Sequence, residues 1–422
     1  MSGKPRKTIE QLQKSISVGT IDVMDDIIPP EPANLDKNAF SRKTSESAPE
    51  DEQPKQSKKS VPPHKRLKWI FFKPEHVSRK KWLLVNGLIV LLVAGGGLGS
   101  YYLYRYLTHV PKQTAAKLAP KEPPKPTTEP SRLTGVQVAP ELNLRSVTGI
   151  MIENSPDARP QSGLKDAGVV FEAIAEGGIT RFLALYQEAQ PDYIGPIRSA
   201  RPYYLDWLLP FDASLAHAGG SPEALQQIKS LGVKDLDQFA NSGAYTRVTS
   251  RYAPHNVYSS IARLEESEKK KGYTGSTFTG FARKAEQPST QPTAKSIDFN
   301  ISAFLYNPHY DYDAVSNSYK RSLGGKPDVD EKSGAQISSK VVVALVMGYG
   351  IADDGKHSVY TTTGSGTVYV FQDGGVTQGT WQKADRKAQF VFTDAQGAPI
   401  KFNPGQTWLS VVHKAGGVTF SP

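Results

Sequence analysis

Polar side chains that could bind or transform a ligand stand at the ends of apolar runs in this 422-residue sequence. Glu153 and Asn154 follow VTGIMI, and His217 closes SLAH before two glycines. Strand ends and the loops after them are where layered α/β domains place ligand sites. We therefore expect these side chains to serve a polar site. The candidates are Glu153, Asn154, Glu172, Glu176, Arg181, Arg198, Ser199, Arg201, His217, Ser221, Arg251, His255 and Asn256.

The segment VVFEAIAEGGITRFLAL predicts a β-hairpin with Gly177–Gly178 as its two-residue turn. Side chains alternate between the two faces of a strand, so Glu172, Glu176 and Arg181 would share one face. An arginine between two carboxylates forms either a structural ion network or the floor of a polar site. In a polar site, a carboxylate without an arginine partner has the higher pKa, which separates an acid from a base. The predicted pairs are Glu176 with Ile179, Ile174 with Arg181 and Glu172 with Leu183.

Two arginines three residues apart, Arg198 and Arg201, stand at the start of the predicted helix RPYYLDWLL. Ser199 could cap that helix, and the free N–H groups of a helix start favour an anion. A guanidinium binds carboxylate or phosphate through two parallel hydrogen bonds, and Arg181 and Arg251 could add to this chemistry. The alternative is a set of surface salt bridges.

Two histidines could transfer protons or bind a ligand. His255 lies in a loop beside Asn256, which suits either task. His217 is either such a group or a hydrogen-bonded core residue. Ser221 follows two glycines, but capping of the helix that begins at Pro222 explains it better than catalysis does.

The sequence carries no motif for a bound metal or cofactor. It has no H-E-x-x-H pair, no phosphate-binding loop that ends in Lys-Ser or Lys-Thr, and no G-x-S-x-G elbow. The absence of cysteine excludes a disulfide framework, a thiolate zinc site and a cysteine nucleophile. We therefore expect neither a metal nor a cofactor.

The elements that must position the candidates are short strands and helices. VTGIMIEN, VVFEAIAE, ITRFLALYQ and ASLAHA predict buried strands, whereas RPYYLDWLL and SPEALQQIKSLG predict helices. The second half of the chain shows short β-type runs between glycine turns. The expected fold is an α/β or α+β ectodomain, with a mixed sheet and helices first and a β-rich region second.

The formal net charge of +10 is explained by membrane topology rather than by nucleic-acid binding. Residues 132–422 hold 29 Lys and Arg against 28 Asp and Glu, so the globular part lacks the basic excess of a nucleic-acid domain. Trp82 to Leu103 hold no charge, and such a helix measures about 33 Å, enough to cross a membrane. The more basic N-terminal flank places the N-terminus in the cytoplasm, where the flank would contact anionic lipids; DNA binding by this flank is a remote alternative.

These patterns divide the chain into seven segments. The prediction is a disordered cytoplasmic tail (1–64), a basic juxtamembrane flank (65–81), a single transmembrane helix (82–104), a proline-rich linker (105–131), an α/β region (132–268), a connector (269–296) and a β-rich region (297–422).

Several motifs in order resemble the YerB-like family of bacterial envelope proteins. They are MIENSPDARPQSGL, VVFEAIAEGGITRFLALY, IGPIRSARPYYLDW, AHAGGSPEAL and APHNVYSS, then YDYDAVSNSYKRSLGGKPDVDEKSGAQI and GSGTVYVFQDGGVTQGTW. The resemblance covers residues 132–422 and implies a two-part domain of unknown function outside the cytoplasmic membrane. Many relatives are held by a lipidated cysteine, which this chain lacks.

The sequence is compatible with three functions. The first is a module that binds an anionic envelope ligand or a peptide terminus through Arg181, Arg198, Arg201 and Arg251, with His255, Asn154 and Asn256 to orient it. The second is an envelope hydrolase with Glu172 or Glu176 as acid or base and His217 or His255 assisting. The third is an envelope scaffold without catalysis. Nothing in the sequence sets the oligomeric state.

Overall fold

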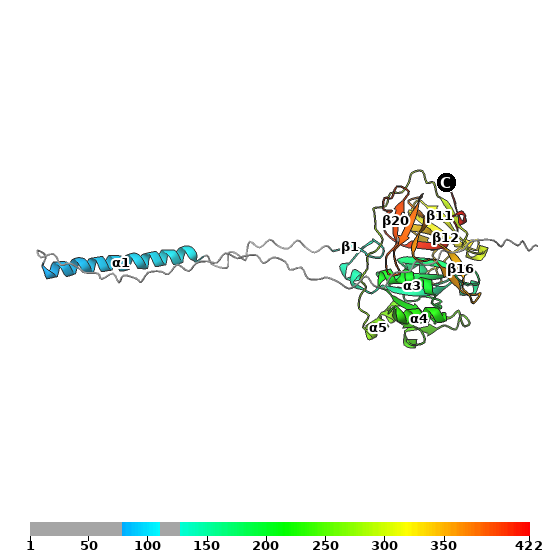
Figure 1. The fold of residues 1–422 in the computed structure, drawn as a ribbon, viewed down its shortest axis with the longest axis horizontal. Coiled ribbons are helices and arrows are strands. Elements are labelled where there is room, and N and C mark those ends of the chain that lie inside the picture. Colours follow the sequence, from blue (N-terminus) through cyan, green and yellow to red (C-terminus); the bar gives the residue numbers. More distant parts are fainter. Residues whose placement is uncertain (1–77, 110–126) are drawn as a thin grey trace, which may run out of the picture. The chain divides into compact units, whose positions relative to one another are not determined.

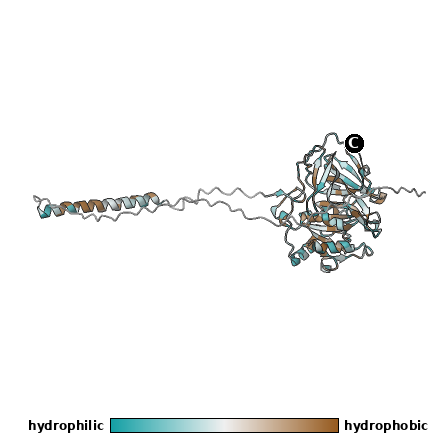
Figure 2. Cartoon of the chain, in the orientation of Figure 1, coloured by the Kyte–Doolittle hydropathy of each residue, from teal (hydrophilic) through white to brown (hydrophobic). Residues whose placement is uncertain are grey.

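The computed structural model describes residues 78–109 and 127–422, in two units divided between Ala119 and Pro120. The first unit contains one described helix, α1 (Arg79–Thr108), which is long and apolar enough to cross a membrane. None of its residues is buried, its apolar side chains are exposed, and the helix is largely hydrophobic (Figure 2). The helix extends beyond the expected 82–104 at both ends. The predictions for the tail, most of the basic flank and most of the linker lie outside the described residues.

A ten-stranded mixed sheet forms the centre of the second unit (Figure 1), as the predicted mixed α/β fold requires. Its order is β20-β19-β18-β15-β21-β4-β5-β3-β6-β7, so each half of this unit contributes five neighbouring strands. The halves join where β21 runs parallel to β4. The strands are β3 (Thr148–Glu153), β4 (Val169–Glu176), β5 (Ile179–Tyr186), β6 (Ser214–His217), β7 (Lys234–Asp237), β15 (Val341–Val346), β18 (Gly364–Gln372), β19 (Gly375–Lys383), β20 (Val391–Asp394) and β21 (Thr407–Val412).

A second sheet of six strands, in the order β13-β12-β11-β10-β22 with β14 beside β12, packs on one face of the first. Phe182 and Trp408 of the large sheet share a buried cluster with Tyr310 and Tyr319 of the small one. The hydrophobic core on this face is therefore built by residues from both halves of the chain. The strands are β10 (Ser296–Phe299), β11 (Pro308–Asp313), β12 (Ser318–Leu323), β13 (Lys326–Pro327), β14 (Ser338–Ser339) and β22 (Val418–Ser421).

The opposite face of the large sheet is covered by α3 (Pro202–Leu208) and α4 (Pro222–Ser230). Trp207 of α3 stacks on Phe171 of β4, with ring centroids 5.6 Å apart. The expected cap of α4 is confirmed, because the Ser221 hydroxyl accepts from the backbone N–H of Ala224 at 3.3 Å. The remaining elements are α5 (Ile261–Lys271), β1 (Glu129–Pro130), β2 (Gln137–Val138), β8 (Thr246–Arg247), β9 (Val257–Tyr258), β16 (Tyr349–Ile351) and β17 (Ser358–Tyr360), with single-turn 3₁₀ helices between them.

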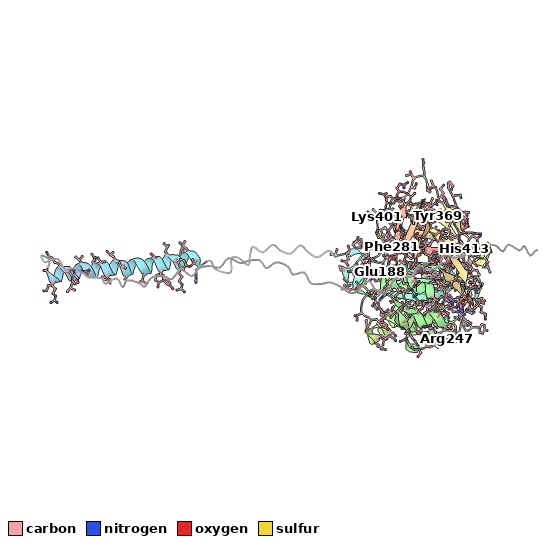
Figure 3. The ribbon with its side chains drawn as sticks, in the orientation of Figure 1. Glu188, Arg247, Phe281, Tyr369, Lys401 and His413 are labelled. Atoms are coloured by element: carbon pink, nitrogen blue, oxygen red, sulfur yellow. The ribbon has the colours of Figure 1, made fainter. Side chains whose placement is uncertain are left out.

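The segment expected to be a plain connector, 269–296, also contributes to the core. Phe281, which is labelled in Figure 3, is buried against Phe392 and Phe402. The ring centroids lie 5.7 and 5.3 Å apart. The segment therefore packs along strands of the second half of the chain.

The β4–β5 hairpin differs from its predicted register. Glu176 pairs with Ile179 as expected, but Glu172 pairs with Phe182 and Ile174 with Thr180. A β-bulge between Ile174 and Glu176 adds one residue to β4 and moves every earlier pair by one position. The bulge also interrupts the alternation of faces, so Glu172 and Glu176 lie on opposite faces of the sheet.

Glu172 forms a buried ion pair with Arg321 of β12 and so joins the two sheets. Neither residue is exposed to solvent, and Nη2 of Arg321 donates to the carboxylate at 3.0 Å. The guanidinium also donates to Asp328 at 2.8 Å and to the Tyr310 hydroxyl at 2.9 Å, and it lies 4.5 Å from the Trp408 ring centroid. Burial alone would lower the pKa of Arg321, but the charges of Glu172 and Asp328 raise it above the usual value.

Removal of one partner of this ion pair should destabilise the fold strongly. Arg321→Met leaves Glu172 charged and buried without its partner, and we expect the free energy of unfolding to fall by roughly 3–5 kcal/mol in urea titrations. The double variant with Glu172→Gln removes one of the two carboxylates that lose Arg321, the other being Asp328, and should be more stable than Arg321→Met alone. As a control, Glu266→Gln breaks an exposed pair with Lys270 and should leave the urea midpoint unchanged. A double variant no better than the single one would contradict this explanation.

Candidate functional site

Three candidate residues are the last residues of strands that run parallel and end at one edge of the ten-stranded sheet. Glu153 ends β3, Glu176 ends β4 and His217 ends β6. β3 and β6 pair in parallel, and β4 runs the same way because both β3 and β4 are antiparallel to β5. These carboxyl ends therefore meet at one edge, the place where sheets of this kind hold ligands.

Glu153 is the centre of the first group of polar residues. Its side chain is 4% exposed, and its two carboxylate oxygens serve different partners. Oε1 accepts from the Ser155 hydroxyl at 3.0 Å and lies 3.3 Å from Nε of Arg198. Oε2 lies 3.0 Å from Nδ1 of His255. A carboxylate only accepts hydrogen bonds, so Nδ1 carries a proton and Nε2 of His255 is left for other contacts.

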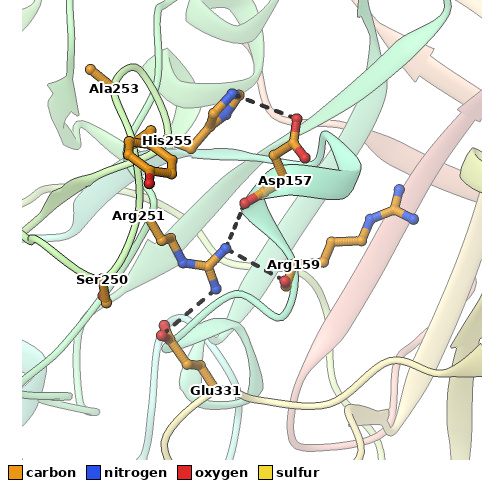
Figure 4. Close-up of a pocket in the computed structure, with 8 residues that line it drawn as sticks. Asp157, Arg159, Ser250, Arg251, Ala253, His255 and Glu331 are labelled. Carbon is orange, nitrogen blue, oxygen red and sulfur yellow. Dashed lines mark hydrogen bonds and ion pairs between the residues drawn. The ribbon is translucent and has the colours of Figure 1, made fainter.

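His255 lies in the wall of a pocket of about 630 Å³ (Figure 4). Arg251 fixes this wall: its guanidinium donates to the carbonyls of Asp157 and Pro160, each at 2.7 Å, and lies 3.7 Å from Glu331. Arg251 thereby ties the tip of the β8–β9 hairpin to the loop after β3. The pocket is lined by Asp157, Arg159, Ser250, Arg251, Tyr252, Ala253, His255 and Glu331.

Arg159 lines the pocket, but its guanidinium is engaged by Asn154. Its guanidinium extends away from Arg251 (Figure 4) and donates to the side-chain and backbone oxygens of Asn154 at 3.0 and 2.9 Å. Burial lowers the pKa of Arg159 below its usual value. Asn154 itself is fully buried and donates to Thr180 at 2.6 Å, so it orders the loop rather than a ligand.

Glu176 is the centre of a second group on the same edge. The carboxylate is bound by Arg181 at 3.1 Å and by Arg201, and Nε2 of His357 lies 3.8 Å away. Both arginine side chains are at most 5% exposed, whereas Glu176 is 35% exposed. Burial would raise the pKa of Glu176, but the two arginines outweigh it and lower the pKa. Burial, together with the charge of Arg181, lowers the pKa of Arg201.

The two groups are neighbours in the sheet. Glu153 of β3 pairs directly with Arg181 of β5, and Arg181 donates to the carbonyl of Ser199, one residue after Arg198. The edge therefore carries a strip of alternating charge. His357 lies beyond Glu176 at one end of it, and His255 is bound to Glu153 at the other.

The predicted helix cap at Ser199 is wrong. The helix α3 starts at Pro202, and Arg201 is its N-cap, without a side-chain capping bond. The preceding residues are extended because Ala200 forms a bridge with Gly220, and the Ser199 hydroxyl donates to the carbonyl of Ala218 at 3.0 Å. Arg198 and Arg201 are consequently separated and serve different carboxylates.

Three further candidates hold the fold together. Glu172 belongs to the buried ion pair between the sheets, Ser221 caps α4, and Asn256 accepts from Arg247 of β8 at 2.9 Å. Each of the three is thus already engaged by a neighbouring element.

His217 is fully buried and ties β6 to β7. Nδ1 lies 2.8 Å from the carbonyl of Gly219, and Nε2 lies 3.0 Å from a carboxylate oxygen of Asp235. Both partners are acceptors, so this geometry needs a proton on each ring nitrogen. Burial would raise the pKa of Asp235, but the hydrogen bond and charge of His217 lower it below the usual value. Glu172 and His217 are fully buried, so a substrate cannot reach them, which argues against both as catalytic groups.

Sequence reasoning missed the acidic wall of the pocket and the histidine beside Glu176. Asp157 lies within MIENSPDARPQSGL, four residues after Glu153, and its charge was the available signal. Glu331 reaches the pocket from the second half of the chain, where its backbone N–H donates to the carbonyl of Gln161 at 2.8 Å. His357 reaches Glu176 through an isolated bridge. No local spacing links these residues to the site.

No cluster of metal-binding side chains occurs within residues 78–109 and 127–422. Three or more His, Asp or Glu side chains do not converge there in a way that could hold a metal ion. The acidic and basic residues of the edge are instead paired with one another.

Comparison with known protein families gives two matches in order. Residues 133–274 match the N-terminal domain of DUF3048, a protein family of unknown function, and residues 297–409 match its C-terminal domain. Both parts therefore contribute strands to the one central sheet.

A similar protein is known from Bacillus subtilis (strain 168), under the name "Putative lipoprotein YerB". It is 30% identical over 285 residues, which are 66% of this chain and 85% of that protein. The crystal structure of YerB from Bacillus subtilis is similar as well, with a TM-score of 0.63 and 28% identity. The match covers 69% of this chain and 99% of the crystallised one.

The contact between His217 and Asp235 should make stability depend on pH. The pKa of Asp235 is lower in the folded chain, so its contribution is present above about pH 4 and is lost as the pH falls through the folded value. We expect Asp235→Asn to lower the free energy of unfolding by roughly 1 kcal/mol at pH 7, and the difference to be smaller at pH 3.

Urea titrations at the two pH values measure this difference. Asp192→Asn, at an exposed position, is the matched control and should change stability at neither pH. An Asp235→Asn effect that is equal at both pH values would contradict the charged contact.

Proposed function

Because the chain belongs to the YerB-like family, whose members carry the paired DUF3048 domains, we propose that this envelope protein binds an anionic ligand, with Arg198 and His255 as the receptor groups. The family itself carries no assigned activity, so the proposal rests on the site. Its ligand is a carboxylated or phosphorylated fragment of the cell envelope, or a peptide terminus. The site lies at the carboxyl edge of the central sheet.

The observation that carries the proposal is that the terminal nitrogens of Arg198 have no hydrogen-bond partner among the described residues. Nε of Arg198 lies 3.3 Å from the buried carboxylate of Glu153 as an ion pair without a hydrogen bond, which keeps the guanidinium beside Glu153. Among the residues that the structure describes, neither terminal nitrogen of Arg198 has a hydrogen-bond partner, and the side chain is 26% exposed. A guanidinium that is paired through Nε and has both terminal nitrogens free suits a carboxylate or phosphate, which accepts two parallel hydrogen bonds.

His255 supplies the second donor as an imidazolium, because Nε2 of a neutral ring with its proton on Nδ1 can only accept a hydrogen bond. Its Nδ1 is engaged by the other oxygen of Glu153, and Nε2 lies 3.9 Å from Asp157, beyond hydrogen-bond distance. A single carboxylate contacts both Arg198 and His255, so the two side chains lie near each other. Glu153 thus acts as a positioning residue behind the receptor groups.

The charge of the ectodomain favours a small anionic group over a polyanion. Its 29 basic and 28 acidic residues give no broad positive field, so recognition depends on local geometry. Nucleic acid is therefore a poor partner for this unit.

The membrane attachment belongs to the same proposal. Helix α1 crosses the membrane once, with the N-terminal side in the cytoplasm and the two-sheet unit outside, and the basic flank contacts anionic lipids. The support is the asymmetry of charge around the helix. Lys65, Arg66, Lys68, Lys73, Arg79, Lys80 and Lys81 precede the apolar run, against Arg105, Lys112 and Lys117 after it.

Hydrolysis is the less supported function. Of the four residues named for it, only Glu176 and His255 are accessible to solvent. Glu176 is engaged by two arginines, and His255 belongs to the other group of polar residues.

The decisive variant is Arg198→Gln. Loss of two charge-assisted hydrogen bonds should weaken retention of the full-length chain on purified cell-wall material by about tenfold or more. The control is Arg132→Gln, which removes the same charge from an exposed position outside the site and should change nothing. Circular dichroism checks that both variants are folded. Unchanged retention of folded Arg198→Gln would contradict the proposal.

A further inference from the structure

Tyr252 is the most exposed aromatic side chain of the two-sheet unit, and it lies in the wall of the pocket that contains His255. The residue is 92% exposed. Other exposed aromatics, such as Phe304 at 69%, lie outside this pocket. An aromatic ring that is left uncovered in an otherwise polar pocket offers a flat apolar surface to a ligand.

The loop that carries Tyr252 is fastened on both sides of the ring. Arg251, the preceding residue, binds the carbonyls of Asp157 and Pro160. Three residues later, the backbone N–H of His255 donates to the carbonyl of Tyr252 at 2.9 Å, and the His255 ring is held by Glu153. The ring of Tyr252 is thus presented by an ordered loop, which lowers the entropy lost when a ligand stacks on it.

The rest of the pocket supplies polar groups of both kinds. Asp157 and Glu331 are acceptors, Ser250 both donates and accepts, and the side chain of Asp157 is 81% exposed. Acceptors and a hydroxyl around one aromatic face match a sugar, whose ring has an apolar C–H face and a rim of hydroxyls. A volume of about 630 Å³ lies within the range of small-molecule sites, roughly 300–1,000 Å³.

We propose that the ligand is an acidic sugar, a pyranose that carries a carboxylate on a short arm. The sugar ring stacks on Tyr252, its hydroxyls bind Asp157, Glu331 and Ser250, and its carboxylate binds His255 and Arg198. This inference rests on the proposed anion site and adds the class of ligand. No covalent step is involved.

The test compares three probes by calorimetry with the full-length chain in detergent. N-acetylmuramic acid has both the sugar and the carboxylate arm, N-acetylglucosamine has the sugar alone, and D-lactate has the arm alone. We expect N-acetylmuramic acid to bind at least tenfold more tightly than either of the others. Equal affinity for N-acetylmuramic acid and D-lactate would overturn the sugar part, because the ring would then add nothing.

Variants separate the sugar contact from the anion contact. Tyr252→Ala should weaken the binding of N-acetylmuramic acid about tenfold. Tyr252→Phe keeps the ring and should bind this sugar as the natural chain does. Phe304→Ala, the matched loss of an exposed aromatic elsewhere, should have no effect. Arg198→Gln should reduce the affinity for N-acetylmuramic acid to that for N-acetylglucosamine.

The outcomes also separate this inference from the proposed function. Binding that depends on Arg198 but not on Tyr252 would overturn the acidic-sugar inference and leave anion binding in place. Binding that depends on neither residue would overturn both.

Discussion

The buried ion pair between Glu172 and Arg321 is the constraint on which the other features of the two-sheet unit depend. Two charges without any solvent exposure are tolerated only because Asp328, Tyr310 and Trp408 complete their contacts. The pair fixes how the six-stranded sheet lies on the ten-stranded one. The strand β12, which carries Arg321, leads into the segment that contains Glu331, so the position of one pocket wall follows from this docking.

The β-bulge in β4 assigns different tasks to the two acidic residues of the strand. Without it, Glu172 and Glu176 would share a face, and one carboxylate could not serve the core while the other serves the edge. With it, Glu172 binds Arg321 between the sheets, and Glu176 binds Arg181 and Arg201 on the opposite face. One extra residue thus separates a structural carboxylate from one that meets solvent.

Local sequence patterns predicted most of the helices and strands. They failed in β4, where one added residue interrupts the two-residue alternation of side chains. The strands that end at Glu153, Glu176 and His217 and the helix capped by Ser221 have the expected positions, because apolar runs and caps act within a few residues. The bulge could not be predicted, since alternation gives no signal for one added residue.

The composition of the site shows the same limit. Glu153, Arg198 and His255 were expected as candidates from their loops, but the contacts among them span up to 102 residues of sequence. Glu331 comes from even farther along the chain. The alternation of charge along the edge arises from strand order, which brings β3, β4 and β5 together. Short motifs can therefore name the residues of such an edge but not their pairs.

The central claim, that an anion binds between Arg198 and His255, is tested most directly by nuclear magnetic resonance of the histidine rings. The full-length chain with ¹⁵N-labelled histidine is titrated with soluble wall fragments released by a muramidase, and His255→Asn assigns the signal. We expect the His255 ring signals to shift until saturation, those of buried His217 to stay unchanged, and the shift to disappear in Arg198→Gln. His255 signals that stay fixed while the fragments bind, or that shift equally in Arg198→Gln, would contradict the claim.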